Sequence, residues 1–302
     1  MEQQPKETRS IPLGNPLPEG RPSETANSLT PQQSCPSCAT TSAGSPSPSW
    51  IYAIGSIEPR FPSLAIEKEY AQLLGRGDMS GLTDRQALQS VLSQSQNRYL
   101  ARRMCWVMTI EGLETYLLYP RDPTDLSLLV EAVRPNPAAT DLDVVIGSKG
   151  PLAPPEVCNA LQIPIVIFDQ VYSMDRDSLV GAIPKPTNVS QEEFSLEAAE
   201  LFDRIMQMAD NAGATDEHRA LNYLAVRYPA VYSVTSDAFA RNSSLESIDV
   251  QTSVLASVRN VVEVVFSFRN RTTDVVEKFF TRVDVTDQFP FLVTKMSPYF
   301  DR

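Results

Sequence analysis

The chain has 302 residues, of which 42% are hydrophobic and 21% charged, a composition typical of a globular protein long enough to bury a sizeable core. Its formal net charge of −11 repels nucleic acid and anionic lipid at long range. No apolar run approaches the ~18 residues of a membrane-spanning helix. We therefore expect neither nucleic acid nor a membrane as a partner. Four cysteines are too few for a disulfide scaffold, which favours a cytoplasmic protein with reduced thiols.

The first 48 residues differ in composition from the rest of the chain. They are rich in Pro, Ser, Thr and Gln and contain almost no aromatic side chain. Such a segment cannot bury enough apolar surface to offset the entropy lost on ordering it. We predict that residues 1–48 form a disordered tail, in which a bound metal would pin only the motif Cys35-Pro36-Ser37-Cys38. Residues 49–302 are expected to fold as one domain.

Strand and helix signals alternate in the first part of this domain. Thr83 and Gln86 form a capping box, which satisfies free backbone N–H groups at a helix start. Asp122 followed by Pro123 predicts another helix start, and the apolar run 164–168 predicts a strand buried on both faces. The expected elements in chain order are a strand at 49–54 that ends at Gly55, helices at 64–74 and 84–92, a short helix or turn near 99–100, a hairpin of 104–110 with 115–119, a helix from 123 that stops before Pro135, and strands at 143–146 and 164–168.

Helices dominate the next part of the chain. Ser190 and Glu193 form a second capping box, and the helix that they open carries a one-sided apolar stripe and is predicted to end at Gly213. Thr215 is the predicted cap of the following helix, which Pro229 breaks or kinks.

The last part of the chain changes its apolar period from helical spacing to two, from about Ser247 onward. This alternation predicts an antiparallel hairpin and then a third strand at 291–296. Mixed elements, then helices, then strands indicate an α+β fold rather than a doubly wound sheet. We expect a mixed or antiparallel sheet, several packed helices and a C-terminal antiparallel β-meander.

The cysteines are the strongest candidates for a site. Cys35 and Cys38 have the two-residue gap that allows two thiolates to bind one tetrahedral Zn²⁺. Cys105 and Cys158 are the candidates for the remaining two ligands, and four thiolates would make the zinc structural, within one chain or across a dimer. In the alternative interpretation, Cys105 and Cys158 are buried thiols and the tail pair is free or redox-active.

Other polar residues carry weaker signals. Asp169, Asp175 and Asp177 follow a predicted strand and would suit a divalent cation. The simpler and favoured interpretation is that Asp175 or Asp177 caps the short helix toward Ile183. His218 is the only histidine of the chain and stands in the first turn of a predicted helix. An acid–base hydrolase or isomerase using Asp169, Asp175 and His218 is one functional alternative.

Several blocks of the sequence resemble the C-terminal domain shared by the cyanobactin maturation proteins PatA and PatG. The resemblance covers roughly residues 35–302. The blocks that carry it include Cys35-Pro36-Ser37-Cys38, the segments 49–55, 58–62, 83–86, 97–102 and 168–173, and above all the run 206–223, MQMADNAGATDEHRALNY.

This resemblance implies an accessory role, because the family domain has no established reaction. The subtilisin-like protease domain that precedes it in PatG has no counterpart in this chain. The resemblance therefore implies a non-catalytic, scaffolding protein that binds a precursor peptide or peptide-maturation enzymes. A zinc-stapled homodimer without a role in peptide biosynthesis is the remaining alternative.

Overall fold

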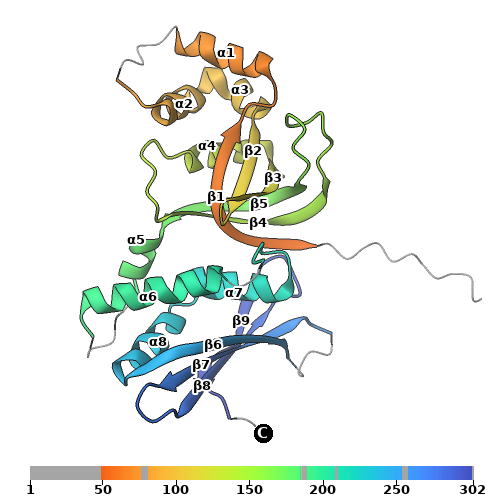
Figure 1. Cartoon of the computed structure of the whole chain (residues 1–302). Coiled ribbons are helices and arrows are strands. Elements are labelled where there is room, and N and C mark those ends of the chain that lie inside the picture. Colours follow the sequence, from red (N-terminus) through yellow and green to blue (C-terminus); the bar gives the residue numbers. More distant parts are fainter. Residues whose placement is uncertain are drawn as a thin grey trace, which may run out of the picture. The chain divides into compact units, whose positions relative to one another are not determined.

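The computed structural model of the chain describes residues 49–75, 81–183, 185, 189–207, 210–253 and 258–300. The tail predicted at residues 1–48, with Cys35 and Cys38, lies outside the described residues. The described part has two sheets, each with its own set of helices (Figure 1). The mixed first sheet and the antiparallel second sheet confirm the predicted α+β class.

A closed five-stranded barrel forms the first sheet, with the strand order β1-β2-β3-β5-β4. Its strands are β1 (Trp50–Arg60), β2 (Cys105–Ile110), β3 (Leu113–Pro120), β4 (Asp141–Leu152) and β5 (Pro164–Asp175). Neighbouring strands are antiparallel except β3 and β5, whose parallel pairing runs from Leu117–Ile165 to Pro120–Phe168. The predicted hairpin of β2 and β3 is confirmed.

Strand β1 is twice as long as predicted because Gly55 does not end it. Its first part pairs with β4 and its second part, from Ser56 on, pairs with β2. A Cβ atom at position 55 would lie 2.3 Å from the carbonyl oxygen of Thr109. Gly55 therefore permits close approach of two backbones at the point where β1 changes partner.

Four helices are associated with the barrel: α1 (Leu64–Leu74), α2 (Asp84–Ser93), α3 (Arg98–Arg103) and α4 (Leu126–Ala132). Their buried side chains share one apolar cluster with barrel residues such as Ile51, Trp106 and Phe168. The predicted capping box is present at α2. Asp122 caps a 3₁₀ turn, Pro123–Asp125, which leads into α4.

The prediction that residues 164–168 are buried on both faces is wrong. Val166 and Phe168 are fully buried, but Ile167 is 38% exposed. The face of β5 that carries Val166 and Phe168 contributes to the apolar cluster of the barrel, so the apolar run reflected one buried face and one partly solvated face.

The second sheet is antiparallel, with the order β6-β7-β8-β9. Its strands are β6 (Ser243–Thr252), β7 (Val261–Asn270), β8 (Val276–Asp284) and β9 (Phe291–Pro298), and the helices of this region are α5 (Arg176–Gly181), α6 (Gln191–Met206), α7 (Asp216–Arg227) and α8 (Ala230–Ala240). Phe266 and Phe268 of β7 pack in one cluster with the apolar faces of α6, α7 and α8. The predicted antiparallel hairpin and third strand are thus confirmed, and β6 adds a fourth strand. Burial does not alternate in β7, because residues 261–268 are buried on both faces.

Helix α6 ends at Met206, seven residues before the predicted end at Gly213. Gly213 has φ +70°, and a Cβ atom there would lie 2.3 Å from the carbonyl oxygen of Tyr52. Its own carbonyl oxygen accepts a hydrogen bond from the Tyr52 amide at 2.9 Å. This glycine therefore seats the segment before α7 against strand β1.

The same region joins the barrel to the C-terminal helices. Tyr52 and Ile54 on β1 belong to the cluster formed by α6, α7 and α8, and the Asn222 side chain on α7 donates to the Tyr52 carbonyl at 2.8 Å. None of the helices in the described part of the chain combines the length and the apolar character needed to cross a membrane.

Candidate functional site

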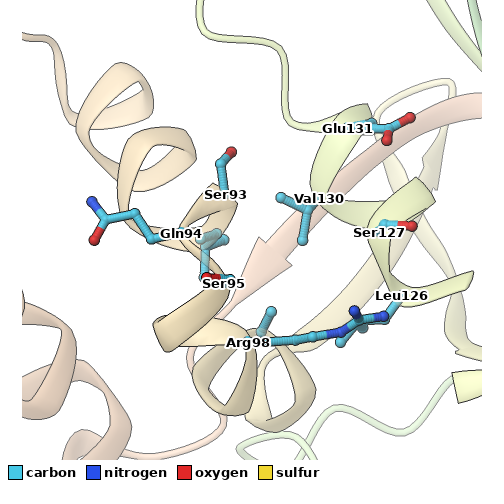
Figure 2. A pocket seen from close by; sticks show the side chains of 10 residues that line it. Ser93, Gln94, Ser95, Arg98, Leu126, Ser127, Val130 and Glu131 are labelled. Atoms are coloured by element: carbon cyan, nitrogen blue, oxygen red, sulfur yellow. The ribbon is translucent and has the colours of Figure 1, made fainter. Parts of the chain in front are cut away.

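A groove between α2, α3 and α4 is the candidate binding site (Figure 2). Its volume is about 270 Å³. The floor is apolar, because Leu92, Ala101 and Leu126 line it while each remains at most 4% exposed. Val130 projects from α4 into the groove opposite α2 and is only partly buried. The groove therefore presents an apolar floor and one accessible aliphatic side chain.

Local interactions hold the helices that form the groove. The Asn97 side chain donates to the Val91 carbonyl at 2.9 Å, which fixes the corner between α2 and α3. The Trp106 indole N–H donates to the carbonyl of Ala101 at 3.0 Å and ties α3 to strand β2. Asn97 and Trp106 are both buried, so the polar groups in these two bonds are protected from water and satisfied within the protein.

The two ends of the groove differ in charge. Arg98 from α3 lies at one end and the exposed Glu131 of α4 at the other (Figure 2). The Arg98 guanidinium donates to the Thr124 carbonyl at 3.0 Å. Among the described residues no carboxylate pairs with Arg98 or with Arg102 one turn further along α3, whereas Arg103 reaches Glu69 at 3.7 Å. The groove therefore has a positively charged end at Arg98 and a negatively charged end at Glu131, so its two orientations are not equivalent for a ligand.

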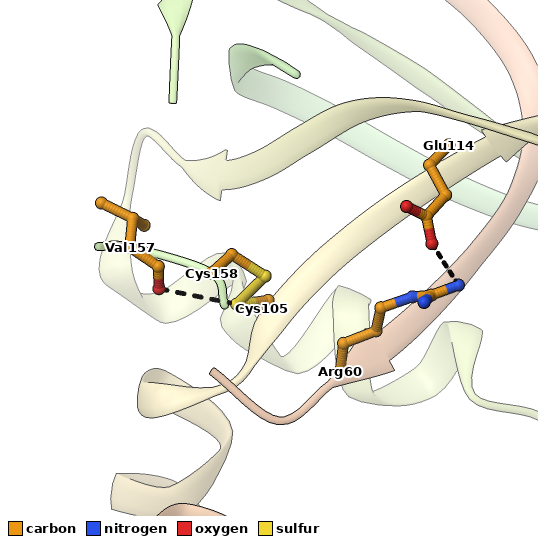
Figure 3. The surroundings of a disulfide bond; sticks show 5 residues. All are labelled: Arg60, Cys105, Glu114, Val157 and Cys158. Atoms are coloured by element: carbon orange, nitrogen blue, oxygen red, sulfur yellow. Dashed lines mark hydrogen bonds and ion pairs between the residues drawn. A yellow bond between two sulfur atoms is a disulfide. The ribbon is translucent and has the colours of Figure 1, made fainter. Parts of the chain in front are cut away.

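Cys105 and Cys158 lie together, as the zinc hypothesis requires, but they form a disulfide in this structure (Figure 3). Both are buried in a small cluster with Val107 and Leu117. Cys105 begins strand β2, and Cys158 lies in the segment that joins β4 to β5. A disulfide sulfur has no thiolate to offer a metal, so zinc would require the reduced pair. Within the described residues, no group of three or more His, Cys, Asp or Glu side chains is placed to hold a metal ion. The four-cysteine site stays a prediction.

The three residues of the acid–base alternative have separate structural surroundings. Asp169 pairs with Arg121 and accepts from the Gln288 amide at 2.6 Å, and these bonds lower the pKa of its carboxyl group, with Arg121 the larger cause. Asp175 lies six residues further along the same strand, roughly 20 Å away in extended geometry. The two carboxylates therefore do not share one site.

Asp175 is a helix cap, as the simpler interpretation predicts. It accepts hydrogen bonds from the Thr140 hydroxyl at 2.5 Å and from the Ser178 amide at 2.8 Å, at the start of α5. These bonds lower the pKa of its carboxyl group, the Thr140 bond most strongly. His218 stands in the first turn of α7, where its backbone amide donates to the capping Thr215 hydroxyl at 3.2 Å.

A buried carboxylate that sequence reasoning missed connects three strands. Asp143 on β4 is 1% exposed, accepts from the Ile57 amide of β1 at 2.8 Å and from the Ser173 hydroxyl of β5 at 2.5 Å, and pairs with Arg134 at 3.3 Å. Burial outweighs these bonds and raises the pKa of Asp143. Nothing in the local sequence distinguishes this aspartate from Asp141, which is why only the fold reveals it.

A tyrosine pair forms a second polar contact that the sequence did not indicate. The hydroxyls of Tyr52 and Tyr172 lie 2.6 Å apart, and the Arg227 guanidinium stacks 4.7 Å from the centre of the Tyr172 ring. Burial, followed by the charge of Tyr172, raises the pKa of Tyr52. The pair joins β1 and β5 to α7 and has a structural role.

Comparison with known proteins supports the resemblance noted in the sequence. Residues 188–299 match the family model described as PatG C-terminal. A solved structure titled "PatG Domain of Unknown Function" matches with a TM-score of 0.68 and 18% identity, over 83% of this chain and 98% of that one. The search of curated proteins returned no match. Residues 188–299 thus match the PatG C-terminal family model, and the fold of this chain is that of the PatG domain of unknown function.

Proposed function

We propose that this protein is a non-catalytic accessory domain that binds a precursor peptide or a maturation enzyme in ribosomal peptide biosynthesis. The observation that carries the proposal is the groove between α2, α3 and α4, with its buried apolar floor and its exposed polar rim. A groove of about 270 Å³ is smaller than a typical small-molecule pocket. An apolar cavity of about 150 Å³ accommodates a benzene ring, so the groove suits one or two apolar side chains of a peptide.

The matched family supplies the biosynthetic context. PatG-type proteins act on ribosomal peptides, and a domain beside such enzymes contributes most directly by holding a substrate or partner. The surroundings of Asp169 and Asp175 favour a non-catalytic role, because the polar contacts of each carboxylate are already made with protein groups.

The test is calorimetric titration of the full chain with a cyanobactin precursor peptide and, separately, with a PatG-type protease. Val130→Asp places a charge in the groove and is expected to weaken binding at least tenfold. Val275→Asp is the matched control, because Val275 is 58% exposed in the turn between β7 and β8. Equal affinity for the two variants, or no binding of either partner to the wild-type chain, would contradict the proposal.

The non-catalytic part of the proposal has its own test. Asp169→Asn and His218→Ala are compared with wild type for product yield in a reconstituted maturation pathway. We expect unchanged yield wherever binding and folding are unchanged. Loss of turnover in a folded variant that still binds its partner would assign a catalytic role instead.

A further inference from the structure

The segment around the groove is basic within an acidic chain. Residues 85–110 contain Arg85, Arg98, Arg102 and Arg103 and no lysine, aspartate or glutamate, whereas the whole chain has a net charge of −11. The segment contributes helix α3 and most of α2 to the groove wall. Of the four arginines, Arg98 lines the groove itself, and Arg102 follows one turn further along α3.

Two of these arginines face outward on one side of α3. Arg98 and Arg102 are four positions apart, so they are neighbours on the same face of the helix, and both are exposed. Arg98 donates one hydrogen bond to the Thr124 carbonyl, but among the described residues neither it nor Arg102 pairs with a carboxylate. The other two arginines do have carboxylate neighbours: Arg103 reaches Glu69 at 3.7 Å, and Arg85 reaches Glu58 at 4.0 Å. Arg98 and Arg102 are thus the cations available to a ligand.

The geometry points to an acidic peptide segment as the occupant of the groove; this inference rests on the proposed function and specifies its partner. We infer that an apolar side chain of the peptide packs against Val130 over the floor of Leu92, Ala101 and Leu126. A carboxylate on the same peptide meets Arg98, and Arg102 adds attraction at longer range. Glu131 at the other end repels acidic residues, so the peptide binds in one direction.

Charge complementarity selects this occupant over others. A basic peptide would be attracted to the chain as a whole, but it would meet Arg98 and Arg102 at the groove itself. A neutral apolar peptide would leave the positive charge of both guanidinium groups without a carboxylate partner. An acidic segment with one apolar side chain would make both kinds of contact. The apolar side chain packs on the apolar floor, and a carboxylate accepts a charge-assisted hydrogen bond from Arg98.

The test uses three fluorescein-labelled synthetic peptides and the full chain. The first carries two leucines with glutamates on one side only, the second replaces every glutamate with glutamine, and the third replaces the leucines with serine. By fluorescence anisotropy we expect the first peptide to bind at least fivefold more tightly than either of the others, with an affinity that falls as salt rises.

Variants with opposite expected effects make the test specific to the groove. Arg98→Gln is expected to weaken binding of the first peptide about two- to fivefold, the range of a partly exposed ion pair, and Glu131→Gln to strengthen it by a similar factor. Arg271→Gln, an exposed arginine between β7 and β8, is the matched control and should change nothing. All three residues are exposed, so the variants are expected to fold.

The outcomes separate this inference from the proposed function. Equal binding of the glutamate and glutamine peptides, or equal effects of Arg98→Gln and Arg271→Gln, would overturn the acidic-peptide inference. If the precursor peptide still bound to wild type and Val130→Asp weakened that binding, the proposed function would stand without the acidic-peptide inference. Failure of the synthetic peptides and of both pathway partners would overturn the two together.

Discussion

Reduction of the disulfide between Cys105 and Cys158 is expected to destabilise the barrel more than any other single chemical step. The disulfide joins residues 53 positions apart in the sequence. In the chain-entropy treatment, closing a loop of that length removes about 14 cal/mol/K from the unfolded ensemble, or about 4 kcal/mol at 25 °C. Reduction should therefore lower the free energy of unfolding by up to that amount.

Urea unfolding of the oxidised and reduced protein measures this effect. With a denaturant slope of about 3 kcal/mol per molar urea, a loss of about 4 kcal/mol moves the midpoint down by about 1.3 M. The slope also changes, because the reduced chain is more expanded when unfolded. The variant Cys105→Ala/Cys158→Ala should behave like the reduced protein and be insensitive to reductant.

The control is Cys35→Ser/Cys38→Ser, which leaves Cys105 and Cys158 as the only cysteines. When denatured without reductant, this variant should show no free thiol, and peptide mass spectrometry should find the two segments linked. Two free thiols, or a midpoint that reductant leaves within about 0.2 M, would refute the reasoning. The first result would also return Cys105 and Cys158 to the role of candidate zinc ligands.

Three further predictions concern other parts of the chain. Burial raises the pKa of Asp143, so its contribution to stability is complete below its unfolded pKa near 4 and is lost as pH rises through its folded pKa. The stability of wild type relative to Asp143→Asn should therefore fall from pH 4 upward. A stability difference that does not change with pH would contradict this assignment. Gly213→Ala should destabilise the fold by about 1–3 kcal/mol through its positive φ alone, with further loss from the contact with Tyr52; an unchanged melting temperature would show that the segment before α7 adjusts. Wild-type protein purified under reducing conditions without a metal-affinity tag should contain roughly one half to one equivalent of zinc per chain. The zinc content should fall sharply in Cys38→Ser. Reduced wild-type protein that contains no zinc would contradict the four-cysteine hypothesis.

Signals that act over a few residues were correctly interpreted from the sequence. The capping box of Thr83 and Gln86 and that of Ser190 and Glu193 are both formed, because the partners are three residues apart and the bonds depend only on the helix that they begin. The same holds for the cap of α5 by Asp175.

The pairing of strands that are distant in the sequence could not be predicted from local patterns. The apolar runs of β3 and β5 indicate strands, but not that these two pair in parallel and close a barrel. Nor does any local pattern bring Arg98 and Val130 to one groove. Glycines were misinterpreted for the same reason: Gly55 and Gly213 were expected to end elements, whereas each accommodates the backbone of a distant strand.

The sequence by itself determined the α+β class, most helix starts and the strand character of β7 and β8, because propensity, capping and period are properties of short segments. Tertiary structure alone decided the barrel closure, the pairing of Cys105 with Cys158, the burial of Asp143 and the groove on α2, α3 and α4. These features depend on which distant segments meet, and that choice is set by the packing of the whole core rather than by any one segment.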